Sequence, residues 1–137
     1  MRMFPHSRMT RNLAPLGLAA LLVVVPLAGH SAELSMLDTL AKGSWNLRLR
    51  DSGGDLRICV RDGREFIQLK HKQAGCSRFI VEDSASEVVV QYTCRGNGYG
   101  RTSIRRESAG LIQVESQGII DGAPFAMSGE ARQSGGC

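Results

Sequence analysis

The sequence has few aromatic residues and few histidines, so few side chains are available to form a catalytic set. Aromatic residues make up 5% of the 137 residues, and Trp45 is the single tryptophan. Only one of the three histidines, His71, lies after residue 32. Nucleophilic catalysis needs a nucleophile, a base and an orienting group, and His71 stands in the polar stretch 70–73, which is typical of a solvated loop. We therefore assign no catalytic residue and expect no cofactor.

A long apolar run occurs once, at the N-terminus, where it has the pattern of a secretory signal peptide. Arg2, Arg8 and Arg11 precede an almost wholly apolar run of 16 residues at 13–28, and small residues follow. The run is shorter than the roughly 20 residues that a membrane-spanning helix needs. We expect residues 1–32 to be removed, with the cut uncertain by a residue or so. A single β-rich domain, 33–137, would then lie in the periplasm or outside the cell, with no transmembrane segment.

An excess of one charge is also missing from the predicted mature chain. The signal segment holds three of the 17 basic residues and none of the 13 acidic ones, so 14 basic residues remain against 13 acidic ones. Nucleic-acid-binding domains normally carry a strong basic excess gathered on one face. The composition therefore argues against nucleic acid as a partner.

The four cysteines lack the spacing of a metal site. Gaps of 17, 18 and 43 residues separate Cys59, Cys76, Cys94 and Cys137, whereas zinc ligands are typically clustered as Cys-x-x-Cys or as close Cys and His pairs. An even cysteine count in a small exported domain is typical of a disulfide framework. We expect two disulfide bonds and no metal.

Hydrophobic periodicity predicts a mainly β fold after one short helix at 34–41. Alternation of apolar and polar residues begins at Trp45, which we expect in the core, and turn residues recur between the apolar stretches. The predicted strands are 45–49, 56–60, 65–70, 78–82, 88–94, one around 104, 111–115 and 125–127. Asp62-Gly63 predicts a hairpin between the second and third strands. About eight short strands favour a small antiparallel meander that closes into a barrel or a sandwich.

The meander indicates how the cysteines pair. Cys76 opens one predicted strand and Cys94 closes the next, at equal distances from the turn around Ala85, so they face each other across a hairpin. An up-and-down course places Cys59 and Cys137 together at the other end of the sheet. We prefer the pairs Cys76–Cys94 and Cys59–Cys137 over the two other connectivities, which the sequence leaves open.

The stretch QYTCRGNGYG, 91–100, looks most like a functional motif because glycine recurs at Gly96, Gly98 and Gly100. A phosphate-binding loop places its glycines between a strand and a helix, with a lysine following in the nucleotide-binding version. Here the strand-like residues 101–104 follow, without a lysine. We interpret the glycines as permitting positive φ angles and a tight crossing between two strands.

Four features occur together in this chain: Gly43-x-Trp45, the order of the four cysteines, Gly98-x-Gly100 after Cys94, and Ser128-Gly129 before Gly136-Cys137. In these features the chain resembles a bacterial exported family, the domain-of-unknown-function family numbered 3617. A turn at 60–63 stands where the family has a helical start, and its Met- and Thr-rich later strands are barely present. The resemblance implies an envelope location and a β-rich fold, and it supplies no activity or catalytic residue.

Arginines offer one binding hypothesis. Two stand on the outward face of the first strand and four surround the glycine-rich turn, and together they could bind phosphates or carboxylates of an unknown envelope protein or polymer. These six residues are Arg48, Arg50, Arg95, Arg101, Arg105 and Arg106. A competing interpretation is a solvated face that nearby acids balance.

Three classes of function remain. We favour a non-catalytic exported binding or structural protein of the envelope. Within that class, Tyr92-Thr-Cys94-x-Gly96 resembles the Tyr-x-Cys strand of small periplasmic lysozyme inhibitors. The second class is an enzyme of unknown type. The third is a metal or thiol-redox protein, which needs free thiols.

Overall fold

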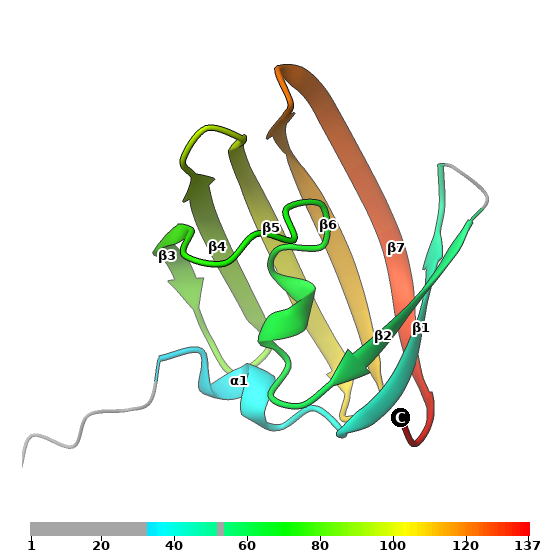
Figure 1. Cartoon of the computed structure of the whole chain (residues 1–137). Helices are drawn as coiled ribbons and strands as arrows, with labels where there is room; N and C mark the ends of the chain where they lie inside the picture. The colour runs from blue at the N-terminus through cyan, green and yellow to red at the C-terminus, as the bar shows by residue number, and fades with distance from the viewer. Residues whose placement is uncertain (1–32, 52–53) are drawn as a thin grey trace, which may run out of the picture.

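The computed structural model describes residues 33–51 and 54–137, so the predicted signal peptide lies outside the described residues. Within these residues, one short helix, one 3₁₀ helix and seven strands follow one another (Figure 1). They are α1 (Ser35–Asp38), β1 (Gly43–Leu49), β2 (Asp55–Val60), η1 (Arg64–Phe66), β3 (Ser77–Asp83), β4 (Glu87–Cys94), β5 (Gly98–Ser108), β6 (Leu111–Ile120) and β7 (Ala123–Gly135). In this part of the chain, no helix is long and apolar enough to cross a membrane.

The strands form one curved antiparallel sheet with the order β2-β1-β7-β6-β5-β4-β3. Strands β3 to β7 make a meander, and β1 then pairs with β7 and carries β2 on its other side. The predicted mainly β antiparallel fold with a short N-terminal helix is confirmed. The sheet is open, with β2 and β3 at its two edges, and it has seven strands where the sequence predicts about eight.

The predicted strand at 65–70 is wrong, because this part of the chain turns into η1 and a loop. Phe66 and Ile67 are neighbours and both are fully buried, whereas two successive residues of a strand would point to opposite sides. Asp62 and Gly63 begin this turn and do not form a hairpin. Gly63 has a φ of 82°, and the Arg64 backbone N–H donates to Asp62 Oδ1 at 3.0 Å.

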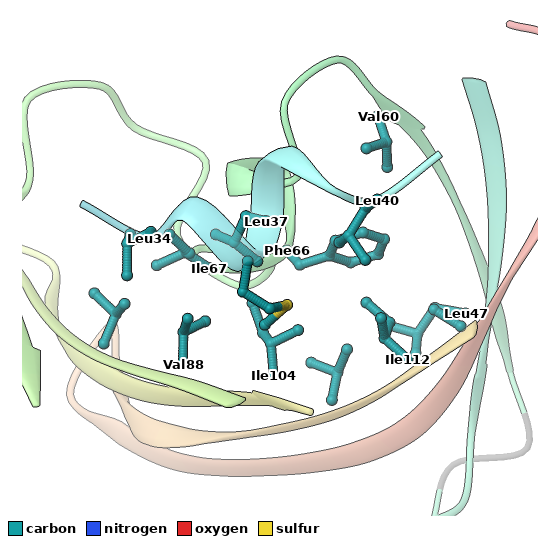
Figure 2. Close-up of a cluster of buried hydrophobic side chains, with 14 of the residues drawn as sticks. Leu34, Leu37, Leu40, Leu47, Val60, Phe66, Ile67, Val88, Ile104 and Ile112 are labelled. Carbon is teal, nitrogen blue, oxygen red and sulfur yellow. The ribbon is translucent and has the colours of Figure 1, made fainter. Parts of the chain in front are cut away.

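The core lies between the concave face of the sheet and the two segments that cover it, α1 and residues 61–76 (Figure 1). Figure 2 shows the side chains of α1 and η1 pointing down onto the strands. The labelled residues are Leu34, Leu37 and Leu40 near α1, Phe66 and Ile67 near η1, Val60 at the end of β2, and Leu47, Val88, Ile104 and Ile112 of the other strands. A helix of four residues is too short to be stable alone, so this packing holds α1 in place.

Trp45 lies in this core, as the sequence predicts. Its side chain is fully buried, and the indole Nε1 donates to the Ala41 carbonyl at 2.8 Å. The indole packs edge-on against the Phe66 ring, with 5.4 Å between the ring centroids. Trp45 therefore joins β1 to the chain after α1 and to η1.

Disulfide bonds join Cys59 to Cys137 and Cys76 to Cys94, the two pairs that the sequence analysis prefers. The first bond ties the edge strand β2 to residue 137 across a sequence separation of 78 residues, and the second ties the end of the 61–76 segment to β4 across 18. The bonds lie at opposite ends of the sheet. Two disulfide bonds are typical of an oxidising compartment outside the cytoplasm.

Candidate binding surface on the outer face of the sheet

The sheet has a second face, opposite α1 and the 61–76 segment, which we call the outer face. Along β4 the side chains of Val88, Val90 and Tyr92 are buried on the concave side, whereas Gln91 and Thr93 are exposed. Successive side chains of a strand point to opposite sides, so the second set belongs to the outer face. The register of the strands then fixes which outer-face residues lie side by side.

Two neighbouring rows at one end of the outer face hold two aromatic side chains and an arginine among apolar and uncharged polar residues. The first row of cross-strand partners consists of Ser77, Thr93, Tyr99, Ile119 and Pro124, and the second consists of Phe79, Gln91, Arg101, Gln117 and Ala126. Phe79 is 69% exposed and Tyr99 is 48% exposed. We call Phe79, Tyr99, Arg101, Ile119 and Pro124 the aromatic–arginine patch. Exposed aromatic side chains beside an arginine are the residue types that dominate binding energy in protein interfaces.

The other half of the outer face carries charges of alternating sign. One row of cross-strand partners consists of Glu87, Arg105, Gln113, Glu130 and Arg48. Gln113 Nε2 donates to Glu130 Oε2 at 3.1 Å, and Arg132 Nε donates to Glu130 Oε1 at 2.7 Å. These hydrogen bonds, from Gln113 first and then Arg132, lower the pKa of Glu130 below its usual value. In this half of the outer face the arginines alternate with acidic residues, which is the pattern of a solvated face whose charges balance.

A polar depression of about 390 Å³ lies beside the aromatic–arginine patch, over β5, β6 and β7. Its lining residues are Asp51, Arg101, Ser103, Glu115, Ser116, Gln117, Ala126, Met127 and Ser128. Within the described residues, the side chains of Arg101, Glu115 and Gln117 have no hydrogen-bond or ion-pair partner. A second depression of about 130 Å³ shares Ser103 and Glu115 with the first and extends toward Arg50 and Arg105.

The structure brings four of the six predicted arginines onto one face. Arg48, Arg50, Arg101 and Arg105 lie on the outer face, spread over three rows. The predicted cluster around the glycine-rich turn does not form, because strand β5 is eleven residues long and places Arg105 at its far end. Arg95 remains at the turn, and Arg106 faces the concave side, where it is half-buried. Anion binding by these arginines remains a prediction.

The prediction that His71 is a solvated loop histidine is wrong. The side chain is 1% exposed, because the 61–76 segment folds inward over the concave face. Nε2 lies 3.0 Å from both the Asn97 and the Ile119 carbonyl oxygens, which only accept, so Nε2 carries the proton and donates. In the neutral ring, Nδ1 then accepts the hydroxyl proton of Tyr92 at 3.0 Å. His71 thus fastens the 61–76 segment to β4, β6 and the turn after β4.

In the glycine-rich stretch the predicted positive φ angles are confirmed, whereas the predicted strand crossing is not, because β4 and β5 pair as antiparallel neighbours. Gly96, in the turn between β4 and β5, and Gly98, the first residue of β5, have φ angles of 77° and 101°. Gly100 leaves room for a buried ring, since a Cβ there would lie 2.4 Å from the Tyr92 hydroxyl oxygen. The stretch therefore turns the chain from β4 into β5 and leaves space for the ring of Tyr92, the hydrogen-bond partner of His71.

Sequence reasoning missed Phe79, Tyr99, Glu115 and Gln117 as surface candidates. A signal for Tyr99 was available, because residues 98–105 alternate between one set that is small or apolar and another that consists of Tyr99, Arg101, Ser103 and Arg105. The positions of Glu115 and Gln117 beside Arg101 depend on the pairing of β5 with β6.

Residues that could hold a metal are not gathered in the described part of the chain. No group of three or more His, Cys, Asp and Glu residues there is close enough to bind an ion, and all four cysteines are in disulfide bonds. Comparison of the chain with protein-family models, with curated proteins and with solved structures finds no match.

Proposed function

We propose that the protein is an exported, non-catalytic β-domain of the bacterial envelope that binds an envelope protein or polymer through the outer face of its sheet. The observation that carries this proposal is the aromatic–arginine patch beside a depression in which three polar side chains, those of Arg101, Glu115 and Gln117, have no partner among the described residues. Membership of family 3617 and a periplasmic or secreted location belong to the same proposal. They are supported by the sequence motifs and by the disulfide bonds.

The exposed aromatic side chains support a binding role. Burying a Phe side chain stabilises a protein by about 1.5–3 kcal/mol relative to leaving it in water, and Phe79 is 69% exposed although a core lies across the same sheet. Tyr99 stands diagonally across β4 from Phe79 and two residues before Arg101. A partner that covers these residues would gain the apolar burial that the free protein leaves unused.

The hydrogen bonds of the interior support a binding role over catalysis. His71 is the one histidine among the described residues, and both of its ring nitrogens form hydrogen bonds, Nε2 with backbone carbonyls and Nδ1 with Tyr92. The two disulfide bonds, one at each end of the sheet, hold the outer face on a rigid support. A rigid surface with exposed anchors is suited to recognition, because little conformational entropy is lost when it binds.

Cosedimentation tests the proposal. The exported protein, with both disulfides formed, is incubated with an insoluble envelope fraction, and the bound amount is measured against concentration. We expect saturable binding that falls at least about tenfold in affinity, or about 1.4 kcal/mol, in a Tyr99→Ser, Phe79→Ser double variant. The control is Leu56→Ser, which removes an exposed apolar side chain from the concave side of β2. Absence of saturable binding, or an equal loss in the control, would contradict the proposal.

A further inference from the structure

We propose that the depression on the outer face is a binding site for a neutral glycan, with Tyr99 as the surface on which a sugar ring stacks. This inference rests on the proposed function, and it names the chemical class of the ligand. It also departs from the anion-binding hypothesis that the arginines suggest in the sequence.

The charges of the depression favour a neutral ligand. Two carboxylates, Asp51 and Glu115, line it together with a single guanidinium, that of Arg101. A phosphate or carboxylate placed here would meet more negative than positive charge. The additional arginines of the adjoining smaller depression, Arg50 and Arg105, stand there with Glu87 and with the same Glu115. Neither depression therefore offers the excess of positive charge that an anionic polymer requires.

The hydrogen-bonding groups of the depression suit a ligand rich in hydroxyls. A hydroxyl both donates and accepts, a carboxylate only accepts and a guanidinium only donates. Glu115, Gln117 and Arg101 stand on adjacent strands, since Gln117 is the cross-strand partner of Arg101 and Glu115 is the partner of Ser103. Neighbouring hydroxyls of a pyranose ring can thus meet an acceptor, a donor and an amide that does both. Because these three side chains have no partner among the described residues, a ligand replaces water and breaks no protein hydrogen bond.

Tyr99 supplies the apolar part of the site. It precedes Arg101 by two residues on β5, so the two side chains share the outer face and stand about 7 Å apart along the strand. Its cross-strand partners are Thr93 and Ile119. The carbon-bound hydrogens of a pyranose form an apolar face that packs on such an aromatic ring, while the hydroxyls at the rim reach the depression.

The position of the depression in the sheet argues against an extended peptide as the ligand. Peptides that bind sheets commonly add a strand to an exposed edge and gain their affinity from main-chain hydrogen bonds. The depression lies over β5, β6 and β7, each of which pairs on both sides, whereas the edges are β2 and β3. A ligand in the depression therefore meets side chains and not main-chain groups, which suits a glycan.

The test is a calorimetric titration of the exported, disulfide-bonded protein with neutral tetrasaccharides, namely the β-1,4-linked N-acetylglucosamine, β-1,4-linked glucose and α-1,4-linked glucose tetramers. Polyglutamate serves as the anionic probe. We expect saturable binding of at least one tetrasaccharide, weakened at least about fivefold by Glu115→Gln and by Tyr99→Ala. Gln91→Ala, a control on the outer face of β4, should leave the affinity unchanged.

Three outcomes overturn the inference: no tetrasaccharide binds, the variants bind as well as the parent, or polyglutamate binds more tightly and Arg101→Gln abolishes its binding. The cosedimentation assay separates this failure from failure of the proposed function. If the envelope fraction still captures the protein through Tyr99 and Phe79 while the tetrasaccharides do not bind, the partner is of another class and the glycan inference alone fails. If neither assay detects binding, both fail.

Discussion

Replacement of His71 by alanine should destabilise the protein by about 3–5 kcal/mol. The change removes a buried ring and leaves the Tyr92 hydroxyl and the Asn97 and Ile119 carbonyls without their partner. A buried polar group left unpaired costs about 1–3 kcal/mol, and the cavity left by a large side chain adds to this. Small domains have a total stability of about 5–15 kcal/mol, so the loss would be a large fraction of the whole.

The assay is guanidinium unfolding with the disulfides intact, followed by the fluorescence of Trp45, the single and fully buried tryptophan. Lys72→Ala, at the exposed neighbouring position, is the control and should change the stability by less than about 0.5 kcal/mol. Tyr92→Phe removes one of the hydrogen bonds of His71, and a double-mutant cycle should give a coupling energy of about 1–2 kcal/mol. If His71→Ala costs no more than Lys72→Ala, His71 is solvated and the account of the 61–76 segment is refuted.

Four further predictions follow from the geometry. Gly100→Ala should lower the free energy of unfolding by about 1–3 kcal/mol, because the added Cβ would clash with the buried Tyr92 ring and the packed core cannot easily shift. Thermal unfolding measures this loss, and an unchanged melting temperature would contradict the prediction. Burial raises the pKa of Tyr92 above its usual 10.0, so the folded state favours the neutral phenol. The stability that this preference adds is complete below pH 10 and is lost as the pH rises through the folded-state pKa. Alkaline unfolding curves should show this loss, and Tyr92→Phe should abolish it. The Arg64 hydrogen bond lowers the pKa of Asp38 below its usual 3.8. Asp38→Asn should therefore reduce the stability at neutral pH and have no effect once the pH falls below the folded-state pKa of Asp38. An equal loss of stability at neutral pH and below that pKa would exclude this ion pair. Replacing both cysteines of the Cys59–Cys137 bond by serine should cost about 4.5 kcal/mol in the chain-entropy model, given the sequence separation of 78 residues, and denaturant unfolding that shows less than about 1 kcal/mol would contradict that model.

The strands were predictable from local alternation. Where one face of a strand is buried and the other solvated, as in β1 with Trp45 and Leu47 inside and Asn46 and Arg48 outside, period two is visible in the sequence. Apart from Asp62-Gly63, where no hairpin forms, the turn residues between the strands marked the hairpins, and equal distances from a turn then indicated the pairing of Cys76 with Cys94. Local patterns were sufficient here because antiparallel neighbours in the meander are also neighbours in sequence.

The 61–76 segment could not be predicted in the same way. Its partners are distant in the sequence: Thr102 donates to the Ile67 carbonyl, and His71 reaches Ile119, 48 residues away. Lys70 and Lys72 on either side of His71 are exposed, which made a solvated histidine the natural interpretation. The burial of such a side chain depends on tertiary packing, and no local pattern records it.

On the outer face, too, some features were predictable from local alternation and others depended on how the strands pair. Alternation places Tyr99 and Arg101 on one side of β5, but only the register of β5 with β6, and of β6 with β7, brings Gln117 and Ala126 onto the row of Arg101. The six arginines also appeared closer in sequence than they are in space, because successive residues such as Arg105 and Arg106 point to opposite faces of a strand.

Covalent labelling of carboxyl groups, with and without the envelope fraction, distinguishes the outer face from the concave side as the binding surface. Glu115 lies in the depression of the outer face, whereas Asp62 is exposed in the segment that covers the concave face. We expect that, compared with free protein, bound protein is labelled several-fold less at Glu115 and equally at Asp62. Unchanged labelling at Glu115 with protection at Asp62 would contradict it and place the binding surface on the concave side.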